Sequence, residues 1–127
     1  MEPSANLKLT EKIPIFRGLS ANQVQQVLNA GKMETLEPGK LVCKEGDNSN
    51  SMFILLAGEM VAKIKGVALA HLKPVEILGK MGVITNEPRS ATLKVTEKST
   101  LLSISKIRFD ALMKQDIHMN FLIYKNH

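Results

Sequence analysis

The sequence predicts a single, mainly β domain flanked by helices. Apolar residues at helical spacing occur toward each end of the chain, on either side of a middle region with a different pattern. With 127 residues, the chain has room for one hydrophobic core, so we expect residues 1–127 to form one domain. The middle region holds short apolar runs of strand length separated by glycines and polar turns: Met33 to Leu36, Leu41 to Lys44, Met52 to Leu56, Met60 to Ile64 and Val67 to Leu72.

The composition suits a folded protein rather than a disordered or membrane-spanning one. Hydrophobic residues make up 44% of the chain and charged residues 23%. The longest apolar run, Met52 to Ala57, is far shorter than the roughly 18 residues that a spanning helix needs. No charged start precedes an apolar secretion segment. We therefore expect a cytoplasmic protein without a membrane partner.

The net charge bears on the kind of partner that the chain can bind, and the cysteine content bears on its cellular compartment. The net charge is +5, but the basic residues are spread from Lys8 to Lys125 without a dense block, so we expect no nucleic acid to bind this chain alone. The one cysteine, Cys43, has no intrachain disulfide partner, which fits a reducing compartment. We interpret Cys43 as a small core residue.

Helices are predicted before and after the β region. Ser4 to Lys12 is weakly helical, Pro14 imposes a turn, and Ser20 is a good N-cap for a helix that ends near Gly31. The apolar face of that helix is formed by Val24, Val27 and Leu28. Near the other end of the chain, Ser105 can cap a helix with apolar side chains at Ile107, Phe109, Leu112 and Met113. The apolar segment Ile117 to Tyr124 is a candidate second helix, either packed as core or exposed as a partner surface.

Between these helices the later β region is less regular. Gly66 is placed to turn Met60 to Ile64 into the next strand as a hairpin. Ile77 to Ile84 is predicted to be a short turn or a helix-like excursion. Two further strands, Ala91 to Thr96 and Ser99 to Ile104, are expected on either side of Glu97-Lys98.

Several short motifs along the chain resemble those of one family. The motifs are Ile13-Pro14-Ile15-Phe16-Arg17-Gly18-Leu19-Ser20, Pro38-Gly39, Glu45-Gly46-Asp47, Met52-Phe53-Ile54-Leu55 with Gly58-Glu59-Met60-Val61, and Pro88-Arg89-Ser90-Ala91. Together they resemble the cyclic nucleotide-binding domain of catabolite activator-type regulators, protein kinase A regulatory subunits and cyclic nucleotide-gated channels. The resemblance implies an eight-stranded antiparallel jelly-roll-like β-barrel with N-terminal helices and one or two C-terminal helices.

The most specific match is the family's phosphate-binding cassette. It reads Leu78-Gly79-Lys80-Met81-Gly82-Val83, a loop, and then Pro88-Arg89-Ser90-Ala91-Thr92. The resemblance implies that Arg89 binds the cyclic phosphate, that Ser90 adds a hydroxyl or amide contact, and that the backbone from Gly79 through Lys80 and Met81 to Gly82 closes the cradle. A guanidinium meets a phosphodiester with paired hydrogen bonds, and backbone N–H groups at a helix start add positive dipoles. The candidate ligand is cAMP, with cGMP or another nucleotide left open, and no cofactor or metal is expected.

Lys80 departs from the family pattern, which has a glutamate that accepts hydrogen bonds from the ribose hydroxyl. Lysine has donors and no acceptor, so the loss is expected to cost about 1–3 kcal/mol, or roughly one to two decades of affinity. Two alternatives stay open: the added cation favours a ligand with more phosphate charge, or the ammonium extends into solvent. Gly82, in place of the family's alanine, is expected to loosen the cassette helix.

No enzyme chemistry is expected. His71, His118 and His127 are far apart in the sequence and do not form the histidine and carboxylate cluster of a metal-dependent cupin. No nucleophile-and-base set is evident either. Three interpretations follow: a cyclic nucleotide-responsive sensor domain, a degenerate β-roll that binds a protein partner or a second copy through its C-terminal helices, or the sensor fragment of a longer transcription regulator.

Overall fold

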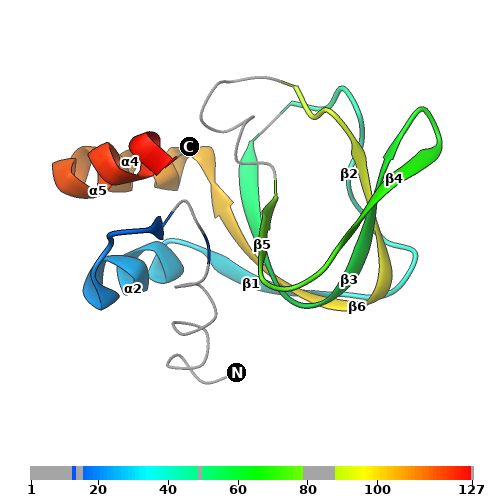
Figure 1. Ribbon diagram of the computed structural model, residues 1–127, viewed down its shortest axis with the longest axis horizontal. Helices are drawn as coiled ribbons and strands as arrows, with labels where there is room; N and C mark the ends of the chain where they lie inside the picture. Colours follow the sequence, from blue (N-terminus) through cyan, green and yellow to red (C-terminus); the bar gives the residue numbers. More distant parts are fainter. Residues whose placement is uncertain (1–12, 14–15, 49, 79–87, 127) are drawn as a thin grey trace.

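The computed structural model describes residues 13, 16–48, 50–78 and 88–126, which are coloured in Figure 1. Within these residues there are three helices and six strands. No helix in this part of the chain is both long and apolar enough to cross a membrane. The elements are α2 (Ala21–Asn29), β1 (Lys32–Leu36), β2 (Leu41–Cys43), β3 (Ser51–Ile64), β4 (Val67–Leu72), β5 (Glu76–Leu78), β6 (Thr92–Ser105), α4 (Lys106–Gln115) and α5 (Ile117–Asn126).

Two long antiparallel strands, β3 and β6, form the centre of the sheet. Their pairing runs from Ser51 opposite Ser105 to Lys63 opposite Thr92. On its outer edge β6 pairs with β1 at one end and β2 at the other, while β3 pairs with β5 and β4. The sheet curls beside the helices in Figure 1, and among the described residues no pairing joins its outer strands. The observed sheet is therefore open.

The prediction of eight strands differs from the six described, and the two long strands explain much of the difference. Met52 to Leu56 and Met60 to Ile64 were expected as separate strands, but both lie in β3. Ala91 to Thr96 and Ser99 to Ile104 likewise fall largely within β6. A glycine such as Gly58, or a charged pair such as Glu97-Lys98, ordinarily marks a turn. Here, however, Glu59 still pairs with Glu97 across a local shift in register. The chain bends at these positions without ending either strand.

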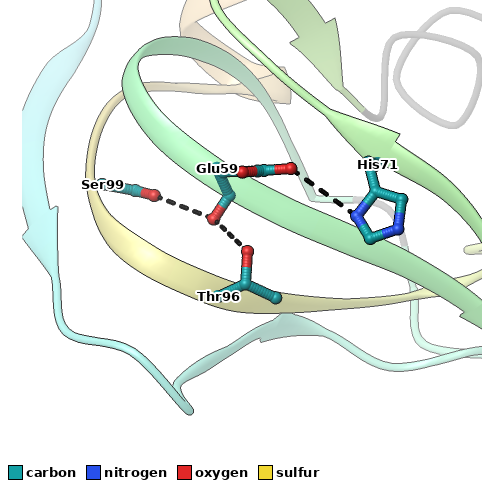
Figure 2. Close-up of polar contacts among 4 residues, drawn as sticks. All are labelled: Glu59, His71, Thr96 and Ser99. Carbon is teal, nitrogen blue, oxygen red and sulfur yellow. Dashed lines mark hydrogen bonds and ion pairs between the residues drawn. The ribbon is translucent and has the colours of Figure 1, made fainter.

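The bend is fixed by close packing and polar contacts around the backbone of Glu59 (Figure 2). The Glu59 carbonyl accepts a hydrogen bond from Thr96 Oγ1 at 3.1 Å, and the Oγ of fully buried Ser99 lies 3.4 Å from it. The Glu59 carboxylate lies 3.6 Å from Nδ1 of His71 on β4. Gly58 has φ +96°, and a Cβ there would collide with Ser99 Oγ and the Lys98 carbonyl. Only glycine fits this position without moving β6.

Of the other local predictions, one is confirmed, one is wrong at its start, and some fall outside the described residues. The hairpin at Gly66 is confirmed: Lys65 and Gly66 have φ of 51° and 78°, as a type I′ turn requires. The prediction of a turn or helix-like excursion from Ile77 is wrong at its start, because Ile77 and Leu78 lie in β5, which pairs with β3. The remainder of that segment and the weakly helical Ser4 to Lys12 lie outside the described residues.

Alternating side chains of β3 and β6 supply two hydrophobic cores. Met52, Ile54 and Leu56 face the helices, whereas Leu55 and Met60 face the interior of the curled sheet. The helix-side core also contains Ile13, Phe16, Val27, Leu28, Leu102, Ile104, Phe109, Leu112, Met113, Met119 and Ile123. The sheet-side core also contains Leu78, Leu93, Val95 and Leu101, with Phe53 and Cys43 packed at its margin.

The helix before the sheet begins and ends where the sequence predicts. Ser20 is the N-cap of α2 and forms a capping box with Gln23, and Val24, Val27 and Leu28 are buried. The helix ends at Asn29 with Ala30 as its C-cap, so Gly31 is the first residue beyond the cap. Gly31 also packs against Leu102, whose Cδ1 would lie 2.8 Å from an added Cβ.

Both predicted helices after the sheet are present. Ser105 caps α4, in which Phe109, Leu112 and Met113 are buried, but Ile107 is 83% exposed. For the apolar segment Ile117 to Tyr124, the sequence left open whether its side chains pack in the core or are exposed. In α5 some of them do each. Met119 and Ile123 join the core, whereas one face stays exposed: Ile117, Phe121 and Tyr124.

Candidate functional site

The backbone of Arg89 is clamped to the turn that follows β2. The Arg89 N–H donates to the Asp47 carbonyl, and the Gly46 N–H donates to the Arg89 carbonyl, both at 2.8 Å. The turn is itself braced, because the Asp47 carboxylate accepts the Lys44 N–H at 3.1 Å and Gly46 adopts φ +82°. These hydrogen bonds hold together two segments about 40 residues apart, the turn at Glu45-Gly46-Asp47 and the segment Pro88-Arg89.

The side chain of Arg89 points into the protein and is only 9% exposed. Its Nη2 donates to the carbonyl of Ser51, the first residue of β3, and its Cζ lies 5.4 Å from the ring centroid of Phe53. A buried cation needs such partners, because desolvation without them is costly. The guanidinium carries five N–H donors in a planar fork, a geometry suited to two oxygens of a phosphate or carboxylate.

Phe53 marks the base of the predicted cassette. It is paired with Leu78 of β5, the residue just before 79–87, and it lies under Arg89, which follows that segment closely. Phe53 therefore lies beside both described parts of the cassette: it pairs with Leu78 across the sheet, and its ring lies under Arg89. Gly79, Lys80, Met81 and Gly82 lie outside the described residues, so their predicted roles stay predictions.

The residues after Arg89 lie partly at the surface and partly against the turn that follows β2. Ser90 is exposed. The hydroxyl of Thr92 accepts the Glu45 N–H at 3.0 Å and so serves the turn after β2. Cys43 is half-buried, and its thiol lies 3.7 Å from the Ala91 carbonyl. Burial raises the pKa of the Cys43 thiol, and the nearby Arg89 cation partly opposes that rise.

The sequence predicts Arg89 as a site residue, and that role stays a prediction; it does not predict the groups that Arg89 contacts. Ser51 contributes a backbone carbonyl, which has no signature in the residue type. Phe53 belongs to the family-like motif Met52-Phe53-Ile54-Leu55, which does not predict a contact with Arg89. Alternation along β3 indicates that Phe53 faces away from Met52 and Ile54, and an aromatic residue on that face is the available signal.

Comparison with known proteins identifies the family. The family model described as "Cyclic nucleotide-binding domain" matches residues 33–116. The chain is 27% identical over 116 residues to a cGMP-dependent protein kinase of Eimeria tenella, covering 91% of this chain and 12% of the kinase. It is 29% identical over 112 residues to a cyclic nucleotide-gated potassium channel of Mesorhizobium japonicum, covering 84% of this chain and 30% of the channel. This chain thus corresponds to a small part of each relative.

Solved structures show the same fold. The N-terminal domain of a transcriptional regulator from Streptomyces coelicolor superposes with a TM-score of 0.84 at 18% identity, covering 93% of this chain and 88% of that one. The regulatory domain of Toxoplasma gondii PKA with cAMP gives 0.80 at 21% identity, with 89% and 45% covered. The Thermus thermophilus catabolite activator protein gives 0.77 at 24% identity, with 89% and 54% covered. Because the family model spans nearly the whole sheet and helix α4, about two thirds of the chain, the chain belongs to the cyclic nucleotide-binding domain family.

Proposed function

We propose that this domain is a non-catalytic regulatory module that binds a cyclic nucleotide, with cAMP as the first candidate ligand and cGMP as the second. The observation that carries the proposal is the buried guanidinium of Arg89, held over Phe53 at the position where the family motif has its phosphate-binding arginine. A relative named as a cGMP-dependent kinase and a similar structure described with cAMP support this ligand class.

In this proposal the cyclic phosphate lies against Arg89, which supplies the positive charge and paired donors. Ser90, exposed beside it, offers a hydroxyl or its backbone amide. The backbone from Gly79 to Gly82 completes the cradle, as the family motif implies. Lys80 removes the acceptor for the ribose hydroxyl, so we propose affinity lower than, or altered from, that of a domain with glutamate there.

A second candidate function is protein interaction through the C-terminal helices. The observation that favours it is the exposed apolar face of α5, where Ile117, Phe121 and Tyr124 recur at intervals of four and three residues. Another protein or a second copy of the chain would bury this face. If the domain is part of a longer regulator, its output belongs to segments beyond this chain. We propose a cytoplasmic location, to which an unpaired Cys43 is suited.

The test is calorimetric titration with cAMP and cGMP of the wild type, Arg89→Ala and Lys80→Glu. Arg17→Ala is the matched control, because Arg17 is exposed and lies away from the cassette in sequence. We expect saturable wild-type binding, lost in Arg89→Ala, retained in Arg17→Ala and tightened roughly ten- to hundredfold in Lys80→Glu. Circular dichroism verifies folding, and Arg89→Lys replaces Arg89→Ala if the latter unfolds. Absence of binding by the wild type at millimolar nucleotide would reject the proposal and favour the second candidate.

A further inference from the structure

A hollow of about 430 Å³ lies where β1 leaves α2 and where β6 runs into α4 (Figure 1). Its volume falls within the range of roughly 300–1,000 Å³ that small-molecule sites occupy. Its polar lining comes from β1, β3, β6 and α4: Lys32, Glu34, Ser51, Ser103, Ser105 and Arg108. The hollow is therefore large enough and polar enough to take a small hydrophilic ligand.

The register of the sheet brings three serine side chains together in this hollow. Ser103 and Ser105 are two residues apart on β6, so their side chains point to the same face. Ser51 on β3 pairs with Ser105 and shares that face. Among the described residues, no hydrogen bond engages the hydroxyl of Ser51 or of Ser103. Both half-buried hydroxyls are therefore available to a ligand.

Two exposed cations border the serines. Lys32 pairs with Ser103 across β1 and β6, and Arg108 lies in the first turn of α4. Within the described part of the chain, neither cation has an ion-pair partner. The half-buried carboxylate of Glu34 lines the same hollow. Two cations and one carboxylate leave an excess of positive charge, so the hollow favours an anion that also carries hydrogen-bond donors.

Side chains, and not the start of α4, supply this site. The Lys106 N–H donates to the Asn50 carbonyl at 2.8 Å, and the Arg108 N–H donates to Ser105 Oγ at 3.2 Å. These first-turn N–H groups are already used by the protein itself. A ligand therefore meets the cationic side chains and the serine hydroxyls.

The hollow is separate from the predicted cassette. The Arg89 guanidinium lies over Phe53, and neither residue lines the hollow. Leu78, which precedes the rest of the cassette, belongs to β5, and β5 and β6 pair with opposite edges of β3. The lining from β1 and β6 thus lies on the other side of β3 from the cassette. Ser51 borders both, because it lines the hollow while its carbonyl accepts Arg89.

A second hollow, of about 310 Å³, adjoins the first and shares Ala30 and Arg108 with it. It lies between α2 and α4, and carboxamides supply much of its polar lining: Gln26, Asn29 and Gln115. A carboxamide both donates and accepts hydrogen bonds, as the recognition of a hydroxyl group requires. Arg108 therefore stands between a side suited to an anion and a side suited to hydroxyls.

We propose that the two adjoining hollows form a second ligand site, which binds a polyhydroxylated phosphate monoester such as a sugar phosphate. A phosphate monoester carries nearly two negative charges at neutral pH, so it matches the pair Lys32 and Arg108. The hydroxyls of Ser51 and Ser103 donate to its remaining oxygens. Glu34 and the carboxamides bind the hydroxyls of the ligand. This site goes beyond the proposed nucleotide binding and does not depend on it.

The probe is ribose 5-phosphate, titrated into the isotope-labelled domain at constant ionic strength and followed by amide chemical shifts. We expect saturable shifts at residues 32–34 and 103–108, with a dissociation constant of about 1 mM or tighter. Ribose alone should not bind, and inorganic phosphate should bind more weakly than ribose 5-phosphate. The proposal is overturned by shifts centred on residues 88–91, or by no saturable shift at about 10 mM probe.

The variants that test the cations are Arg108→Gln and Lys32→Gln. Each removes a charge that bonds the phosphate, so each should weaken binding of ribose 5-phosphate about tenfold or more. Arg17→Gln is the matched control, because Arg17 is exposed and does not line either hollow. Wild-type affinity in Arg108→Gln would overturn the site. Equal weakening by Arg17→Gln would do the same, because the attraction would then be to the basic domain as a whole.

Glu34→Ala tests whether the hydroxyls of the sugar are bound. Loss of this carboxylate reduces repulsion of both ribose 5-phosphate and inorganic phosphate, so the ratio of their affinities reports the hydroxyl contact alone. We expect the preference for ribose 5-phosphate to fall about three- to tenfold. Glu34→Gln replaces Glu34→Ala if the latter does not fold. An unchanged ratio would reject a sugar phosphate as the ligand.

A parallel titration with cAMP separates this inference from the proposed function. Nucleotide binding should move the amides of residues 88–91, whereas ribose 5-phosphate should move those of residues 32–34 and 103–108. Each set of shifts is measured independently, so either site can fail without the other.

Discussion

The guanidinium of Arg89 lies over the ring of Phe53, with Cζ 5.4 Å from the ring centroid. Phe53 also pairs with Leu78 across the sheet, so one residue lies beside both described parts of the cassette. An arginine stacked in this way loses little freedom when it binds an anion, because its plane is already set. If a nucleotide binds as proposed, we therefore expect the ring to contribute to ligand affinity as well as to packing.

Replacing Phe53 with leucine should weaken nucleotide binding about three- to tenfold, because the cation–π contact is lost while the site stays apolar. Phe53→Tyr keeps the aromatic face and should bind like the wild type. Calorimetric titration of both variants, with melting temperatures measured in parallel, checks this. Equal affinity for Phe53→Leu and the wild type would show that the ring does not position Arg89.

Gly58→Ala should destabilise the domain by about 3 kcal/mol or more, because a Cβ would collide with the backbone of β6 at a residue with positive φ. Gly39→Ala is the matched control: Gly39 also has positive φ, at +92°, but no atom lies within 4 Å of an added Cβ. Urea unfolding measures both. If the two variants lose the same stability, backbone conformation alone accounts for Gly58.

The thiol of Cys43 should react slowly with iodoacetamide near neutral pH. Its raised pKa leaves less of the reactive thiolate than a free cysteine has at the same pH. Arg89→Met should slow the reaction further, because the Arg89 cation is one of the influences that lower this pKa. Alkylation rates across pH 7 to 10 provide the check. Faster reaction in Arg89→Met would indicate that loss of packing outweighs loss of charge.

Asp116 should stabilise the fold more at neutral pH than in acid. The Met119 N–H and the Gln23 amide hold the pKa of its carboxyl below the ordinary value. A lowered folded-state pKa gives stability that is present above the unfolded-state pKa and lost as pH falls through the folded-state pKa. The stability difference between wild type and Asp116→Asn should thus shrink from pH 7 to pH 3 in urea unfolding. A difference that stays constant with pH would contradict the assignment.

The sequence predicted most elements, and its errors have identifiable causes. Ser20 and Ser105 were recognised as caps because capping depends on the residue type at one position. The continuity of β3 through Gly58 was missed, since the glycine that signals a turn here permits a bend within a paired strand. Ile77 and Leu78 were missed because two apolar residues before a glycine are too short a run to show strand alternation.

The site was predictable only where it depends on residue type. The Pro88-Arg89-Ser90-Ala91 motif predicts Arg89 as the phosphate ligand, and this role stays a prediction. Its clamp to Gly46 and Asp47 consists of backbone hydrogen bonds, which any residue can make and which leave no mark in the sequence. The exposure of Ile107 left no mark either, because helical spacing identifies an apolar side chain without saying whether another element covers it. For the same reason the sequence left core packing and exposure as alternatives for Ile117 to Tyr124.

Ile54 and Leu55 are neighbours on β3, yet their side chains enter different cores. The two cores therefore share a wall, and neither can lose its packing without removing support from the other. Helices and curled sheet are consequently expected to unfold in one cooperative transition, so that a destabilising change near α5 lowers the melting temperature of the sheet by the same amount.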